Sequence, residues 1–240
     1  MSLNSSQFSK PYRCAIYFVP EVHSAWWQAG SAWLGRCAAT GQSLAQPRLS
    51  DISPEAQWAT TSDPRRYGWH ATLKAPFQML SGEDVASVVS SLHALAKTLP
   101  AFDLPALQVS KQDGFLALRP VGDVSRINST AAACVKALHR LAAPLSEADV
   151  ARRRQAALSP EQDRLLLAWG YPYVFDEFQF HLSLTGRLDG MSEAEQTAWQ
   201  GAAQAHFHDL PVCRFDRLAL FVEPTPGADF QWVDQVELLA

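Results

Sequence analysis

The chain has 240 residues, of which 48% are hydrophobic, and its formal net charge is −4. This length and composition can bury a substantial core, either as one large domain or as two small lobes. A protein that coats nucleic-acid phosphates is normally basic, so the charge excludes broad nonspecific binding to DNA or RNA, and no apolar run reaches the roughly 18 residues that a membrane span needs.

The first half of the chain predicts strands and helices around one long loop. Residues 1–10 are polar and serine-rich, and we expect a disordered tail there, followed by a single domain over residues 11–240. The expected elements are a strand over 14–19, a helix over 23–37, a loop over 40–64 with one short helix after Ser53, a strand over 69–77, a helix over 81–99 capped by Ser81, and strands over 106–110 and 114–120 joined by a turn.

The second half predicts a similar series of elements. The run Ser159-Pro160-Glu161 is a typical helix start, and Gly170 is a typical helix end. The expected elements are a helix over 128–142, two helices within 146–170, a strand over 178–188, a helix over 192–206 capped by Ser192, and strands over 212–222 and 230–239.

The two halves share an order of elements. Each has a strand that contains a histidine, then a serine-capped helix, then two strands joined by a turn. This order indicates a diverged internal duplication, although few residues are identical between the halves. It predicts two similar lobes that face each other, each of which offers one strand to a shared cleft.

The strand near residue 70 carries a polar face. Strand side chains alternate between the two faces of a sheet, so His70, Thr72 and Lys74 are expected on one face. The opposite face is apolar and fits a core. The first strand is therefore predicted to present an imidazole, a hydroxyl and a cation in one line.

The strand near residue 181 has the same inventory. Here the alternation places His181, Ser183, Thr185 and Arg187 on one face. Two such strands suit a phosphodiester, because one histidine can act as a base while the other acts as an acid, and the hydroxyls can donate to phosphate oxygens. No carboxylate lies on either face, so the pattern does not suggest a metal site or a cofactor.

Several other side chains are weaker candidates. Tyr17, Tyr67 and Tyr173 could line the cleft, with Tyr171 beside them, although such aromatic residues more often pack in a core or at its rim. Positively charged runs at residues 65–66 and 152–154 could contact a phosphate, but a solvated surface is the simpler interpretation. The four cysteines lack a C-x-x-C spacing and fit reduced thiols in a cytoplasmic protein.

The two motifs resemble those of the two-histidine (2H) phosphoesterase superfamily, whose best-known branch is the LigT-like cyclic phosphodiesterases. The family pattern is His, apolar, Ser or Thr, apolar, found twice, and residues 70–73 (HATL) and 181–184 (HLSL) match it. The flanking residues 67–74 (YGWHATLK), 169–174 (WGYPYV) and 180–187 (FHLSLTGR) are similar to a bacterial branch associated with phosphonate-degradation (carbon–phosphorus lyase) operons.

The resemblance implies an α+β fold with two pseudo-symmetric lobes of antiparallel sheet, helices on the outside and the site in a central cleft between the lobes. It also implies hydrolysis of a small cyclic or linear phosphodiester, without a metal, by the two histidines. A ribose or nucleotide cyclic phosphate in phosphonate metabolism is the expected substrate. Two alternatives stay open: a binding module that holds a nucleotide or sugar phosphate without turnover, and an RNA ligase, which the negative net charge disfavours. The oligomeric state and the roles of the individual histidines are left open.

Overall fold

A computed structural model of the chain describes residue 8 and residues 10–240. Most of the expected N-terminal tail, residues 1–7 and 9, therefore lies outside the described residues. The strands are β1 (Arg13–Phe18), β2 (Ala71–Phe77), β3 (Phe102–Asp103), β4 (Leu107–Gln112), β5 (Phe115–Pro120), β6 (Leu182–Ser183), β7 (Arg214–Phe215), β8 (Arg217–Glu223) and β9 (Gln231–Glu237). The helices are α1 (Ala25–Leu34), α2 (Pro54–Thr60), α3 (Ser62–Tyr67), α4 (Val85–Ala96), α5 (Ser125–Leu138), α6 (Glu147–Arg154), α7 (Pro160–Trp169) and α8 (Glu193–Phe207), with 3₁₀ turns η2 (His139–Leu141) and η3 (Phe175–Glu177).

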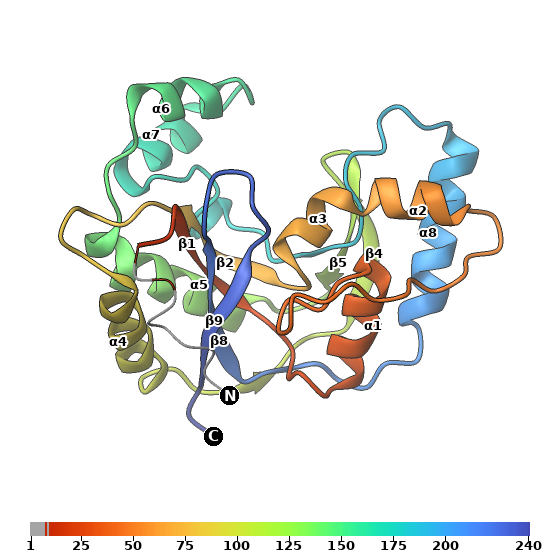
Figure 1. The fold of residues 1–240 in the computed structure, drawn as a ribbon, viewed down its shortest axis with the longest axis horizontal. Helices are drawn as coiled ribbons and strands as arrows, with labels where there is room; N and C mark the ends of the chain where they lie inside the picture. The colour runs from red at the N-terminus through yellow and green to blue at the C-terminus, as the bar shows by residue number, and fades with distance from the viewer. Residues whose placement is uncertain (1–7, 9) are drawn as a thin grey trace.

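One open antiparallel sheet organises the molecule, in the strand order β4-β5-β6-β2-β1-β8-β9. The predicted α+β class is confirmed. The two expected lobes are the two halves of this one sheet, and they join where Ala71 of β2 pairs with Leu182 of β6. In Figure 1, α1, α2, α3 and α8 gather on one side of the molecule, and α4, α6 and α7 on the other.

The hairpins of the two halves are exchanged. The β4–β5 hairpin follows β2 in the chain, but β5 pairs with β6. The β8–β9 hairpin follows β6, but β8 pairs with β1, which pairs with β2. The short strands β3 and β7 also pair across the halves. Each half therefore completes the part of the sheet that carries the histidine of the other half.

Local sequence signals explain most helix and turn boundaries. Serine side chains cap several helices, and Ser159 and Ser192 form complete capping boxes. Asp113 and Gly114 both have positive φ, as a type I′ turn requires, which explains the tight β4–β5 hairpin. One predicted start is wrong: α4 begins at Val85 because Asp84, not Ser81, accepts the hydrogen bond that caps it.

The second histidine strand is much shorter than the predicted span of residues 178–188, because β6 contains only Leu182 and Ser183. The backbone N–H groups of Leu184 and Thr185 both donate to the carbonyl oxygen of Leu116, which ends the regular ladder. The next N–H, of Gly186, donates to the carbonyl oxygen of Thr60, the last residue of α2. The loop between residues 40 and 64 also contains two helices rather than one.

Close packing fixes the position of the first histidine. Trp69 is fully buried and its indole lies against α1 at Gly30, where an added Cβ would come within 2.0 Å of the ring. Because only a glycine allows this approach, Trp69 is anchored directly before His70. All four cysteines are free. In the described part of the chain, every helix is too short or too polar to cross a bilayer.

Candidate active site

The two histidine motifs meet at the centre of the sheet. Continuing the Ala71–Leu182 register by one residue in each direction places His70 opposite Ser183, and Thr72 opposite His181. Facing residues of an antiparallel pair have Cβ atoms about 5 Å apart. The two imidazoles and the two hydroxyls therefore form a crossed square, and all four side chains line one cavity.

The two imidazoles are held in the same way. His70 Nδ1 lies 2.8 Å from the carbonyl oxygen of Gly68, and His181 Nδ1 lies 2.9 Å from that of Gln179. A carbonyl accepts only, so each Nδ1 carries the proton and each Nε2 has its lone pair free when the ring is neutral. His70 Nε2 is 3.3 Å from the Thr72 hydroxyl. The Nε2 atom of His70 thus lies beside one of the hydroxyls of the site.

Gly68 orients His70 through its backbone. Its φ of +82° and ψ of 178° belong to a region that is essentially restricted to glycine. An added Cβ would also lie 2.5 Å from the Cβ of Ala38. This conformation ends α3 and directs the Gly68 carbonyl to the imidazole, so the glycine before the motif has a direct role in the geometry of the site.

Burial favours the neutral form of both rings. Burial lowers the pKa of His70 to about 4, against an opposing hydrogen bond to Gly68, and the nearby His181 lowers it further. Burial also lowers the pKa of His181, and Arg119 contributes in the same direction. The Tyr17 ring lies 3.8 Å from the His70 ring, centroid to centroid. In the free protein both rings are therefore mainly in the neutral form near neutral pH, in which Nε2 has its lone pair free.

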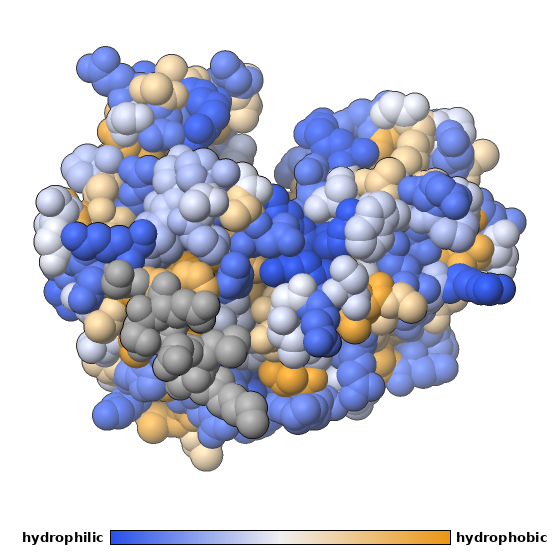
Figure 2. All heavy atoms as spheres, viewed as in Figure 1, coloured by the Kyte–Doolittle hydropathy of each residue, from blue (hydrophilic) through white to orange (hydrophobic). Residues whose placement is uncertain are grey.

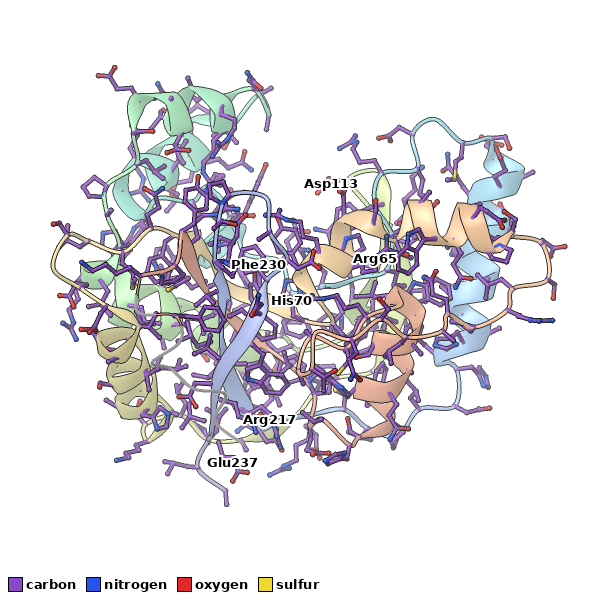
Figure 3. The ribbon with its side chains drawn as sticks, viewed as in Figure 1. Arg65, His70, Asp113, Arg217, Phe230 and Glu237 are labelled. Carbon is purple, nitrogen blue, oxygen red and sulfur yellow. The ribbon has the colours of Figure 1, made fainter. Side chains whose placement is uncertain are left out.

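The cavity around the histidines has a volume of about 380 Å³. Figure 2 shows this face of the molecule hollowed in the middle, with hydrophilic residues gathered there. In Figure 3, His70 lies in the middle of the molecule, between Phe230 and Arg65 of α3. The cavity is large enough for a nucleotide-sized or sugar-phosphate ligand, whose usual sites measure roughly 300–1,000 Å³.

Two of the predicted tyrosines line this cavity. Tyr17 is fully buried and its hydroxyl has no hydrogen-bond partner among the described residues. Tyr67 stacks on Phe230 with ring centroids 4.8 Å apart, and its ring is 6.0 Å from that of His70. The third, Tyr173, lies outside this cavity and packs edge-on against Tyr171, which does line it.

Lys74 is not on the histidine face. Thr72 pairs with Tyr17 but Lys74 pairs with Ile16, so β2 has one extra residue between the two pairs. Such a bulge reverses the alternation of side chains beyond it. Lys74 is consequently only 4% exposed, and its Nζ lies 4.9 Å from the centre of the Phe77 ring. The predicted alignment of Lys74 with His70 is wrong.

The distal residues of the second motif are near the cavity but are already engaged. The Thr185 hydroxyl accepts a hydrogen bond from the Leu116 N–H at 2.9 Å, so it holds β6 against β5. Arg187 is largely exposed and pairs with Asp189 at 2.6 Å. Both line the cavity. The Thr185 O–H can still donate, and the exposed Arg187–Asp189 pair is a weak one, so their contact with a phosphate stays a prediction.

The sequence reasoning did not single out three side chains that line the cavity. Phe115 lies 5.6 Å from the His181 ring, centroid to centroid, because β5 pairs with β6. Arg13 enters from β1, and Asp63 enters from α3. No signal near either histidine motif points to them, since only the strand order brings them close. In the part of the chain that the structure describes, no three His, Cys, Asp or Glu side chains converge as metal ligands would.

Residues 72–231, about two thirds of the chain, match the family described as "Protein of unknown function (DUF1045)". The chain belongs to this family. The matched span contains Thr72, His181 and Ser183 and begins two residues after His70.

Two curated relatives are longer proteins. "Ribose 1,5-bisphosphate phosphokinase PhnN" of Laribacter hongkongensis (strain HLHK9) is 39% identical over 95% of this chain and 52% of its own length. The protein of the same name from Janthinobacterium sp. (strain Marseille) is 36% identical over 92% of this chain and 49% of its own length. The chain thus spans about half the length of the curated relatives it matches.

Solved structures with a similar course of the chain include E. coli LigT. LigT complexed with 3′-AMP aligns over 96% of this chain and 100% of LigT, with 12% identity and a TM-score of 0.46. LigT complexed with ATP aligns over 97% and 100%, with 11% identity and a TM-score of 0.43. A structure described as a phosphoesterase aligns over 96% and 100%, with 13% identity and a TM-score of 0.43.

Proposed function

We propose that this protein is a metal-independent phosphodiesterase that hydrolyses a small cyclic phosphodiester of ribose or of a nucleotide. The observation that supports this most is the matched pair of imidazoles. Each Nδ1 lies on a carbonyl oxygen, and both histidines line a cavity that Thr72 and Ser183 line as well. Acid–base catalysis needs two such groups that reach one substrate.

In the proposed reaction, the phosphate lies between the two strands and accepts hydrogen bonds from the Thr72 and Ser183 hydroxyls. One neutral histidine takes a proton from water through Nε2 while the water oxygen forms a bond to phosphorus. The bond from phosphorus to the leaving ring oxygen breaks, and the other, protonated histidine donates its Nε2 proton to that oxygen. The proton then returns from the first ring to the second, directly or through solvent, which restores the starting state.

Two further observations support the substrate class. The relatives' name states that those longer proteins act on a phosphorylated ribose, and opening a ribose cyclic phosphate yields a ribose phosphate monoester. Aromatic rings of Tyr17 and Tyr67 border the histidine site, where they can pack on a sugar or a base. We also propose a cytoplasmic location, which the four free cysteines support.

The test is hydrolysis of a panel of ribose and nucleoside cyclic phosphates by the wild type, His70→Ala and His181→Ala. General acid–base groups contribute typically 10²–10⁴-fold, so each variant should lose activity on that order. His208→Ala is the matched control, because His208 is exposed and lies outside the cavity. Full activity is expected in the presence of EDTA. Unchanged turnover in both active-site variants would disprove the mechanism, and phosphate binding without cleavage of any substrate would favour a binding module.

A further inference from the structure

A second cavity, of about 320 Å³, lies beyond the histidine site. It is enclosed by the end of β2, by α5 and η2, and by the α6–α7 pair, which Figure 1 shows together at one corner of the molecule. We call it the Lys74 cavity, after the side chain that enters it from β2. Its lining also contains His139, Arg153, Trp169 and Tyr171.

The Lys74 cavity lies next to the histidine site. Five residues line both cavities: Arg13, Ala75, Pro76, Arg153 and Tyr171. The bulge that removes Lys74 from the histidine face is also what directs it into this second space. The bulge therefore removes Lys74 from the histidine cavity and places its amine in the Lys74 cavity.

Three polar groups from three different elements have no hydrogen-bond partner among the described residues around this cavity. Lys74, from β2, is 96% buried, and no hydrogen bond or ion pair joins it to any described residue. His139 Nδ1, from η2, and Arg153 Nε, from α6, are buried without a hydrogen-bond partner in the described chain. Buried polar groups are nearly always paired in folded proteins. Because all three lack a hydrogen bond within the protein, we infer that a ligand supplies the missing hydrogen bonds.

The charge of these groups indicates an anion. Lys74 and Arg153 each carry one positive charge, and the Arg153 guanidinium lies 5.1 Å from the centre of the Tyr171 ring. The one carboxylate in the lining, Asp149, is already bound to the Ser146 hydroxyl at 2.7 Å and to Arg152 at 2.6 Å. Arg13 is likewise engaged, since it pairs with the buried Glu223 at 2.5 Å. The positive charges of Lys74 and Arg153 are therefore left without a carboxylate partner in this lining, and a ligand anion can neutralise them.

The protonation states agree with this picture. Burial lowers the pKa of Lys74 to about 8, so the amine is still mainly charged at neutral pH. Burial also lowers the pKa of His139, and the neighbouring Lys74 has the same effect. A phosphate monoester is close to a dianion at neutral pH and matches two fixed charges and one neutral hydrogen-bonding imidazole.

We propose that the Lys74 cavity binds the phosphate monoester group of a small molecule. Lys74 and Arg153 neutralise the phosphate, His139 adds a hydrogen bond, and Trp169 and Tyr171 form an aromatic wall for the rest of the molecule. This phosphate is held and not cleaved, because the two-histidine pair lies in the neighbouring cavity. The binding step does not depend on the proposed hydrolytic activity.

The direct test is calorimetric titration of the full-length protein with inorganic phosphate and with ribose 5-phosphate. We expect saturable binding by the wild type and at least tenfold weaker binding by Lys74→Met. Lys97→Met is the matched control, because Lys97 is exposed at the end of α4, and it should bind as the wild type does. Arg153→Gln provides a second variant, since Arg153 lies on the outer helix α6 and its replacement leaves the core intact.

A spectroscopic readout separates binding at Lys74 from a structural effect. In protein with isotope-labelled lysines, phosphate should raise the pKa of the Lys74 amine by at least one unit, because an anion favours the charged amine. No saturable binding by the wild type, or equal affinity in Lys74→Met, would refute the proposal.

Two sources of the phosphate group are possible, and kinetics distinguish them. If it belongs to the substrate, Lys74→Met should raise KM at least tenfold more for a ribose cyclic phosphate that carries a 5-phosphate than for a nucleoside 2′,3′-cyclic phosphate. If it belongs to a separate molecule, phosphate should change turnover of the nucleoside substrate by the wild type and not by Lys74→Met. Binding that persists in the His70→Ala/His181→Ala double variant supports the site even if hydrolysis is never found.

Discussion

Replacement of Lys74 by methionine should stabilise the protein at neutral pH. Lys74 is 4% exposed and has no anionic partner among the described residues. Its pKa falls from 10.5 to about 8 on folding. Each pKa unit corresponds to 1.36 kcal/mol, so the charged amine costs about 3 kcal/mol of unfolding free energy at pH 7. Methionine is unbranched and can fill the same space without a charge.

The difference in unfolding free energy between wild type and Lys74→Met should depend on pH, which distinguishes the effect of the charge from an effect of packing. Below pH 8 both folded and unfolded states hold the proton, and the full cost is present. Between pH 8 and 10.5 the folded protein releases the proton while the unfolded chain keeps it, so the wild type gains stability relative to Lys74→Met. The advantage of the variant, about 3 kcal/mol at pH 7, should therefore decline and level off near pH 10.5.

The assay is urea denaturation of wild type, Lys74→Met and Lys97→Met at pH 7, 8, 9 and 10, in buffer without phosphate. The difference in unfolding free energy between two of these proteins cancels the titration of the groups they share. Lys97→Met is the control at an exposed position. A Lys74→Met protein that is less stable than wild type by the same amount at every pH would refute the reasoning. Added phosphate should reduce the advantage of the variant, since it gives the amine a counter-ion.

Further predictions concern the histidine site and its support. Burial lowers the pKa of both His70 and His181, so kcat/KM should reach its maximum below pH 6.5, with an acidic limb near pH 4; a maximum above pH 7 would contradict this. Gly68→Ala should cost about 1–3 kcal/mol in thermal or urea unfolding and should lower kcat, because the backbone that orients His70 is strained by a side chain. Glu223→Gln should destabilise by about 2–3 kcal/mol in the same assays, since the fully buried carboxylate accepts from two arginines; a loss below 0.5 kcal/mol would show that solvent replaces it.

The sequence predicts the local features of this protein well because they depend on short-range chemistry. Alternation of side chains places His70 with Thr72 and His181 with Ser183, and both pairs line the cavity. Serine caps and the Asp-Gly turn mark most boundaries for the same reason.

The features that were missed depend on pairing between distant strands. The bulge before Lys74 exists because β2 and β1 differ by one residue across that stretch, and neither strand shows this alone. The second motif was predicted as a long strand, but its N–H groups bond Leu116 and Thr60 instead of a ladder. Arg13 and Phe115 reach the site only through the order of the strands, which periodicity does not reveal.

The exchange of hairpins between the halves has a consequence for how such a fold can be divided. A chain cut between the two histidine strands would give fragments that each lack the hairpin flanking their own histidine. Neither fragment could close its part of the sheet, and β3 and β7 would also lose each other. The two fragments should form the site only when they are mixed. A half-length chain of this design could complete its sheet only as a dimer in which the two copies exchange hairpins.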